Sequence, residues 1–378
     1  MVVVVVVHGL LHLFGAAKGL GWADVSQLRQ PIGVASGLAW LVGAALVVVT
    51  GVLLAAPPRW WWVLGGIAAV VSQALIATSW NDAKAGTIVN VILAAAVVYE
   101  FAVRGPRSLQ VDYQRRVAAA LAESAPLGLV TEVDLAVLPA LVAEYVRRCG
   151  AVGRPRVRDF RATIHGRIRS GAGKPWMSFV GEQVNTYSPS PNRLFRMNAT
   201  MFGLPVDVLH LFVDQAATMR VRLCSLIPLV DASGPELDRA ETVTVFNDLC
   251  VLAPAALVDA AVTWQQLDDL SVRGSFTRGE HTVSAALTFD TDGDLVDFHS
   301  DDRSGFSPDG KQPTPRTWST PVERYRTLHG RRLATYGEAR WRDAPPGGEF
   351  TYLEFHVDDI AYNVGDAQRV RREAPQLT

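Results

Sequence analysis

The chain begins with long apolar stretches and continues with short alternating ones. Four stretches near the N-terminus contain almost no charged side chains: residues 1–17, 32–56, 60–80 and 86–103. A helix needs about 20 apolar residues to cross a bilayer. The second and third stretches meet this length, and the first and fourth are shorter. We therefore predict a membrane α-helical bundle, with a four-helix transmembrane region over residues 1–103.

The residues between these stretches fit the same interpretation. Pro57 and Pro58 separate the second stretch from the third, and the tryptophans at positions 60–62 are typical of an interfacial anchor. The first stretch lacks the charged start of a signal peptide, and Lys18 follows it directly. We therefore expect the first stretch to remain as a helix.

Basic residues give an expected orientation. Arg104, Arg107, Arg115 and Arg116 follow the fourth stretch, and arginine near the end of a span favours the cytoplasmic side. We therefore expect a multi-pass protein of the plasma membrane whose soluble part is cytoplasmic, although Lys18 and Arg29 then face outward.

A few polar residues lie inside the predicted spans. His8 and His12 are four residues apart and share a helix face, so they are either ligands of a haem or metal or neutral histidines hydrogen-bonded within the bundle. The second interpretation is preferred, because the other spans contain no second histidine pair. We expect Ser72 and Gln73 to form hydrogen bonds between helices, and Glu100 to lie near Arg104.

The remainder of the chain reads as a connector, residues 104–137, and a soluble antiparallel β-rich domain, residues 138–378. Two helices are predicted before the strands, over residues 111–124 and 139–149. From Arg156 onward apolar and polar residues alternate, as in half-buried antiparallel strands.

The alternation predicts about ten strands and one helix. The helix runs from Glu236 to about Leu252, between two prolines. A long antiparallel sheet must curl or close. The expected fold class is therefore a membrane α-helical bundle plus an α+β soluble domain, in which an antiparallel curved sheet (half-barrel) holds an inserted lid helix.

Composition excludes several classes. The net charge is −1, so a nucleic-acid partner is not expected. The three cysteines, Cys149, Cys224 and Cys250, have neither disulfide nor zinc spacing. The common hydrolase, metalloprotease and nucleotide-binding motifs do not occur. We predict no cofactor, no metal site and no catalytic residue, and we favour a binding protein over an enzyme.

Several motifs resemble an uncharacterised family of bacterial membrane proteins. They are His8–Leu13, Gln30–Ile32, Ser79–Lys84, Leu138-Pro139, Tyr145, Trp176, Glu182-Gln183, Asn247-Asp248, Ala253–Leu257 and Trp318–Pro321. The resemblance spans nearly the whole chain and implies no activity. The strand pattern with one internal helix is also similar in topology to the half-barrel of bacterial lipoprotein carriers. Those proteins hold acyl chains between a curved sheet and a helical lid outside the cytoplasm, which conflicts with the orientation expected here.

Acidic clusters were the candidates for polar chemistry. The run from Asp290 to Asp294 lacks the glycine and glutamate of a calcium-binding EF-hand, so we predict a hairpin turn. Asp301-Asp302-Arg303 and Asn247-Asp248 would serve acid–base catalysis only if the fold buried them together. An exposed loop and a helix surface are the simpler interpretation.

The apolar candidates lie on one predicted strand. Phe195, Met197 and Met201 share one strand face, and methionine adapts to flexible acyl chains. These three residues either line a ligand cavity or belong to an ordinary core. Two functions follow. The first is a membrane-tethered module that binds a lipid or other apolar molecule. The alternative is a membrane-associated enzyme with an unrecognised polar site in the half-barrel, which would require convergent polar groups with perturbed pKa values.

Overall fold

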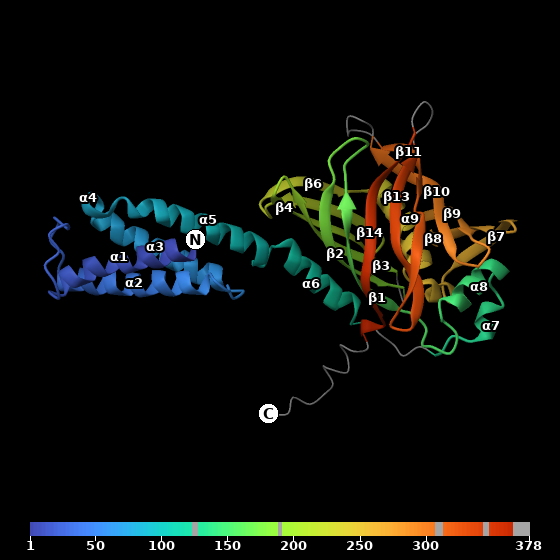
Figure 1. Cartoon of the computed structure of the whole chain (residues 1–378), viewed down its shortest axis with the longest axis horizontal. Helices are drawn as coiled ribbons and strands as arrows, with labels where there is room; N and C mark the ends of the chain where they lie inside the picture. Colours follow the sequence, from blue (N-terminus) through green and yellow to red (C-terminus); the bar gives the residue numbers. More distant parts are fainter. Residues whose placement is uncertain (123–127, 188–190, 307–312, 343–347, 366–378) are drawn as a thin grey trace. The chain divides into compact units, whose positions relative to one another are not determined.

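The computed structural model describes residues 1–122, 128–187, 191–306, 313–342 and 348–365. The chain divides into two compact units, Met1–Asp112 and Tyr113–Thr378 (Figure 1).

The first unit is helical. Its helices are α1 (Val2–Gly19), α2 (Val34–Leu53), α3 (Trp61–Thr78), the short α4 (Trp80–Ala83) and α5 (Gly86–Arg104). α1, α2, α3 and the segment that begins with α5 are long and apolar enough to cross a membrane, by length and composition. Glycines bring α1 and α2 together: a Cβ atom on Gly19 would lie 2.6 Å from the Cα atom of Gly37. The four predicted apolar helices are present, and their crossing of a membrane stays a prediction.

A polar network joins the helices of this unit. His8 Nε2 lies 3.2 Å from both Ser72 Oγ and Asn90 Oδ1, and His12 Nε2 lies 2.9 Å from Ser72 Oγ. Gln73 bonds to Thr87 and Asn90. The hydrogen-bonded interpretation of the histidines is therefore confirmed. Within the described ranges, no group of three or more His, Cys, Asp or Glu side chains is placed to hold a metal ion.

The second unit contains four helices and a 3₁₀ turn in its described part. The sequence enters it within α6 (Leu109–Ala120), continues through α7 (Glu132–Leu135) and α8 (Ala140–Arg148), and later forms α9 (Pro235–Val251) and η1 (Pro254–Val258). Pro139 precedes α8, and Gly150, with a φ of 75°, follows it, so this helix ends where the sequence predicts.

In its described residues, the sheet of the second unit has fourteen strands. They are β1 (Asp159–Ile168), β2 (Met177–Thr186), β3 (Asn192–Met201), β4 (Leu204–Val213), β5 (Ala216–Leu223), β6 (Ile227–Ser233), β7 (Val262–Asp268), β8 (Ser271–Arg278), β9 (His281–Phe289), β10 (Leu295–Phe306), β11 (Pro313–Ser319), β12 (Val322–Leu328), β13 (Arg331–Arg342) and β14 (Glu349–Tyr362). Their order is β6-β5-β4-β3-β2-β1-β14-β13-β11-β10-β9-β8-β7, and β12 pairs with β13. Neighbouring strands are antiparallel throughout, so two meanders meet where β1 pairs with β14.

The ten predicted strands are present, but the count was too low. β6, β7, β11 and β12 were missed because their sequences do not alternate cleanly. β6 is an apolar run interrupted by Pro228, and β11 contains two prolines. Proline is tolerated in a sheet only where its missing N–H is not needed. Two predicted turns, at 188–192 and 345–348, lie largely outside the described residues.

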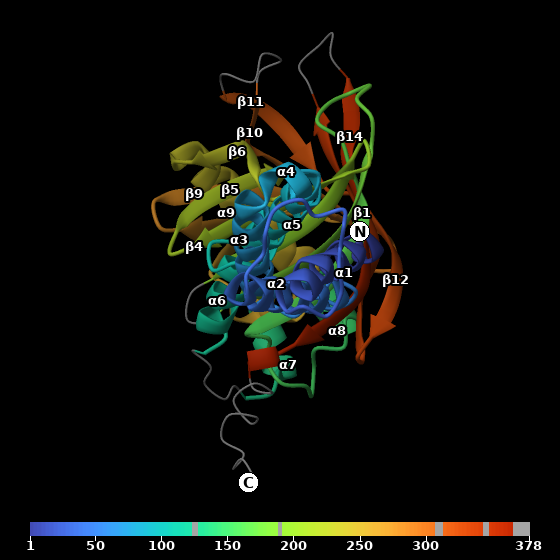
Figure 2. The same cartoon turned by 90° about the vertical axis from the view of Figure 1, so that its left-hand side faces the viewer.

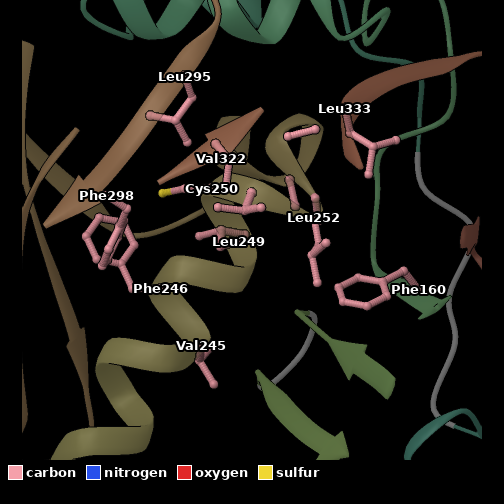
Figure 3. Packing of buried hydrophobic residues seen from close by; sticks show 14 of the residues in the cluster. Phe160, Val245, Phe246, Leu249, Cys250, Leu252, Leu295, Phe298, Val322 and Leu333 are labelled. Atoms are coloured by element: carbon pink, nitrogen blue, oxygen red, sulfur yellow. The ribbon is translucent and has the colours of Figure 1, made fainter. Parts of the chain in front are cut away.

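The inserted helix is enclosed by the sheet (Figure 1). Every residue of α9 from Ala240 to Val251 is buried, so this part of the helix is covered on every side. The predicted lid is therefore an internal helix. The apolar core around its C-terminal half includes Phe246, Phe298 and Leu333, each 0% exposed (Figure 3). Figures 1 and 2 both show α7 and α8 at the end of the sheet opposite the start of β11.

Candidate functional site: the inner face of the half-barrel

The inner face of β2–β5 changes from apolar to polar along the strands. Nearest the β3–β4 and β5–β6 turns, Ala199 pairs with Val206 and Val206 with Leu223. In the next row Met197 pairs with Val208, and Val208 pairs with Val221.

The following rows contain the polar residues. Gln183 pairs with Phe195, which pairs with His210. One row further along, Asn185 pairs with Arg193. Because opposite residues of an antiparallel pair share a face, these polar side chains lie on the same inner face as the apolar rows.

The three predicted ligand-binding residues lie together on this inner face. Phe195 and Met197 are buried in the core, with exposures of 9% and 5%, and Met201 is partly buried against the same core. Gly181 lies opposite Met197, and a Cβ atom there would come within 2.7 Å of the Phe195 ring. Arg196 is half-buried, whereas Asn198 and Thr200 are exposed, as expected for the opposite face. That the three residues bind a ligand stays a prediction.

Exposed apolar side chains border the apolar end of this face. Phe202 in the β3–β4 turn is 86% exposed, and the backbone N–H of Cys224 in the β5–β6 turn donates to Pro205 O, so the two turns are adjacent. We call the exposed set the apolar rim; it comprises Phe202, Leu204, Leu226, Ile227, Leu229 and Val230. Apolar patches on a protein surface often mark sites of protein or membrane contact.

The polar rows are connected to α9 by an ion-pair network. Asp248 Oδ2 accepts hydrogen bonds from Gln183 Nε2 at 2.7 Å, Arg193 Nε at 2.8 Å and Asn185 Nδ2 at 3.0 Å. The Arg193 guanidinium also lies over the ring of Phe195, 5.2 Å from its centroid. Arg193 thus contacts both the polar network and the first predicted ligand residue.

Glu241, about two turns earlier on α9, is the second centre of this network. Its side chain is 0% exposed and accepts from Arg193 Nη1 at 3.2 Å and from Thr244 Oγ1 at 3.1 Å. His210 Nε2 lies 3.3 Å from Oε1, and Arg303 Nη2 lies 3.7 Å from it. The Arg303 guanidinium also lies 4.4 Å from the centroid of the Trp318 ring.

Burial and charge shift the pKa values of this network in different directions. Burial lowers the pKa of His210 to about 4, so this histidine is neutral at neutral pH. Burial opposes ionisation of Glu241, but the positive charges of Arg193 and Arg303 hold its pKa below the usual value. For Asp248 burial outweighs Arg193, and its pKa is raised. Buried groups with perturbed pKa values therefore do converge inside the half-barrel.

The predicted acidic clusters take separate partners. Asp248 binds Arg193, whereas Asp302 pairs with Arg239 and accepts from the Ser284 backbone at 2.7 Å. Asp301 is exposed. The Asp290 segment is a turn, as predicted: Asp290 Oδ1 accepts from the backbone N–H groups of Asp292 and Asp294.

Sequence reasoning missed Arg193, His210 and Glu241. A signal was present for two of them. Arg193 is in phase with Phe195 and Met197, and His210 is in phase with Val206 and Val208, so a polar residue occupies a core position in each strand. Such residues usually have a buried partner. Glu241 carries no comparable signal because α9 has no alternating pattern.

Fold and site together define an antiparallel half-barrel around an internal helix, with an inner face that is apolar at one end and ionic at the other. The model of a family of unknown function (DUF6544) matches residues 128–355. The chain belongs to this family. No curated protein matches the sequence.

Solved structures of similar proteins include three with low sequence identity. A DUF1329 family protein from Desulfovibrio piger is 13% identical, with a TM-score of 0.34, and the match covers 60% of this chain and 93% of that one. A putative outer membrane lipoprotein-sorting protein domain from Vibrio parahaemolyticus is 8% identical, with a TM-score of 0.30 and coverages of 57% and 92%. A LolA superfamily protein from Nitrosomonas europaea is 10% identical, with a TM-score of 0.27 and coverages of 59% and 92%.

Proposed function

We propose that this protein is a membrane-tethered module that binds a lipid or another apolar molecule at the apolar end of the half-barrel's inner face. One observation carries the proposal: large apolar side chains at this end pack against the core but are only partly buried. They include Ile168, Met201, Leu223, Leu353 and Phe355. Each leaves apolar surface that a ligand would remove from water, at about 25 cal/mol per Å².

The other end of the interior is closely packed, which supports placing the ligand at the apolar end. Around the C-terminal half of α9, Phe246, Leu249 and Phe298 are at most 2% exposed (Figure 3), and close packing of this kind leaves little space for a ligand. The ion pairs of Arg193 with Glu241 and Asp248 then fix α9 against the sheet. Phe195 and Met197 lie on the same strand face as Met201, and we assign all three to the ligand surface.

The bilayer is the second partner in this proposal. The four helices of the first unit are of spanning length and composition, and we infer that they hold the chain in the plasma membrane as a multi-pass protein. The arginines at positions 104, 107, 115 and 116 support a cytoplasmic location for the half-barrel. A cytosolic reporter fused after Thr378 should then be active, and activity of a periplasm-only reporter would contradict this orientation.

The experiment for ligand binding uses neighbouring residues on opposite faces of β3. The fragment Tyr113–Thr378, which is a compact unit, would be titrated with a fluorescent fatty acid. Met201→Asp places a charge on the inner face and should weaken binding at least tenfold. Thr200→Asp places the same charge on the exposed face and should bind like the wild type. Circular dichroism checks that each variant is folded. A folded wild-type fragment that binds no apolar probe would contradict the proposal.

The buried ionic network is the observation that favours the alternative, an enzyme. Against it, Glu241 has no solvent exposure and Asp248 Oδ2 already accepts three hydrogen bonds, so neither carboxylate is free to reach a substrate. Glu241→Gln separates the two functions. A binding module should keep its affinity for the apolar probe in this variant, whereas an enzyme should lose turnover of ester or phosphoester substrates.

A further inference from the structure

A second site lies outside the inner face, beside the β12–β13 turn. A pocket of about 320 Å³ is lined by Arg154, Pro155, His329, Arg331, Ala361, Tyr362 and Asn363. Its residues come from the segment before β1, the β12–β13 turn and the end of β14. The volume falls at the lower end of the range for small-molecule sites, roughly 300–1,000 Å³.

The floor of this pocket carries a buried positive charge. Arg331 is 6% exposed, its Nη2 donates to Pro155 O at 2.7 Å, and its guanidinium lies 5.5 Å from the centroid of the Tyr362 ring. Its Nη1 is buried and has no hydrogen-bond partner among the described residues. Buried arginines are normally paired with a carboxylate. Burial lowers the pKa of Arg331, and the neighbouring guanidinium of Arg154 lowers it further.

A second guanidinium lies at the mouth. Arg154 is exposed, and its Nη1 and Nη2 would each be 2.7 Å from a Cβ atom on Gly330, so this guanidinium lies against the turn. His329 and Gly330 have φ angles of 47° and 77°. Glycine suits this left-handed turn, and because it has no Cβ atom it leaves room for the Arg154 guanidinium.

The acidic groups bonded to His329 and to Arg156 have partners other than the two pocket arginines. Asp359 Oδ1 lies 2.7 Å from His329 Nε2. Arg156 forms salt bridges with Asp134 and Asp259, each at 2.5 Å. The pocket therefore combines two arginines with no carboxylate of its own among its lining residues.

We propose that this pocket binds a small oxyanion, a phosphate or carboxylate group. Arg154 donates hydrogen bonds to it in the planar fork that suits both groups. Arg331 supplies a buried positive charge beneath it, where the low dielectric strengthens attraction. The phosphate group belongs either to a soluble molecule or to a lipid head group. This proposal is independent of apolar-ligand binding, because none of the pocket residues belongs to the apolar rows.

The test uses the full-length protein in a neutral detergent at constant ionic strength. Inorganic phosphate, citrate and short-chain phosphatidate would be titrated by calorimetry and by thermal unfolding. At least one of the three should bind and raise the unfolding temperature of the wild type. Arg154→Gln, at an exposed position, should fold normally and weaken that binding at least tenfold. Arg342→Gln removes an exposed arginine elsewhere and should change the affinity less than twofold.

Each outcome decides the question. Phosphatidate binding much tighter than phosphate, and sensitive to Arg154→Gln, identifies a lipid phosphate. Equal or tighter binding of phosphate or citrate, with the same sensitivity, identifies a soluble anion. The proposal is wrong if none of the three anions binds, or if Arg154→Gln and Arg342→Gln weaken binding equally. Arg331→Gln serves as a second variant, and folded protein should lose anion binding while still binding the fluorescent fatty acid.

Discussion

The Nε atom of Arg193 on β3 lies 2.8 Å from Asp248 Oδ2 on α9, and both residues are more than 90% buried. The pair joins residues 55 positions apart and connects the internal helix to the inner face next to Phe195. Removing two charges from water is costly, and attraction offsets that cost only when the hydrogen bonds are complete. Gln183 and Asn185 supply the additional donors to Asp248.

Breaking this pair should destabilise the second unit strongly. Asp248→Ala leaves Arg193 with Glu241 alone and removes the acceptor of two buried amides, so we expect a loss of about 3–5 kcal/mol in the free energy of unfolding. Chemical denaturation followed by near-UV circular dichroism measures it. Glu323→Ala is the control, because Glu323 and its partner Arg324 are 61% and 62% exposed, and surface pairs contribute about 0–1 kcal/mol. Equal losses in both variants would show that the buried Arg193–Asp248 pair contributes no more to the free energy of unfolding than a surface pair.

His210 should make stability depend on pH. Burial lowers its pKa from 6.5 to about 4, so between these values the unfolded chain binds more protons than the native one. Stability is then complete above about pH 6.5 and falls as the pH drops toward 4, by on the order of 3 kcal/mol. His210→Gln should flatten this part of the pH profile. An unchanged slope in the variant would mean that His210 is charged in the native state.

Asp297 on β10 should make the stability of the fold depend on pH in the opposite direction to His210. Burial raises its pKa to about 6, and its Oδ1 is buried with no hydrogen-bond partner in the described part of the chain. The native state therefore holds the proton between about pH 4 and 6, and stability falls as the pH rises through this window. Asp297→Asn should raise the free energy of unfolding at pH 7 by about 1–3 kcal/mol. No gain at pH 7, with the wild-type profile retained, would contradict the shift.

Periodicity was enough to predict most of the fold. The four apolar helices, the helix that ends at Gly150 and the ten alternating strands are all present, because in each the pattern follows directly from which face is buried. The pattern did not predict β6 and β7, because these strands form the two edges of the sheet. An edge strand with exposed residues on both faces has no alternation to detect.

The site was harder to predict than the fold. The sequence identified Phe195, Met197 and Met201 as one face, and the registers place them together. It did not reveal that Glu241 would meet Arg193 and His210, because those contacts depend on how the sheet curls around α9. The burial of α9 on every side comes from the same curvature, which no local pattern encodes.

The apolar rim should contact the bilayer in the assembled protein. Cys224 lies in the β5–β6 turn beside the rim, and the other two cysteines, Cys149 and Cys250, are buried, so a thiol-reactive fluorophore can be directed to this turn. In full-length protein in nanodiscs, lipids carrying a nitroxide should quench that fluorophore. Phe202→Glu with Ile227→Glu places two charges in the rim and should reduce the quenching severalfold, because a charge at the membrane interior is costly.

Val137→Glu is the matched control for the rim. Val137 is 80% exposed but lies outside the rim, before α8, so this charge should leave the quenching unchanged. The rim variant should also keep its affinity for the fluorescent fatty acid in the isolated fragment, because Met197 and Met201 are intact. Quenching that persists undiminished in the Phe202→Glu, Ile227→Glu protein, or that falls equally in Val137→Glu, would show that the rim does not contact lipid. Ligand binding on the inner face would then have to proceed without direct contact between these turns and the bilayer.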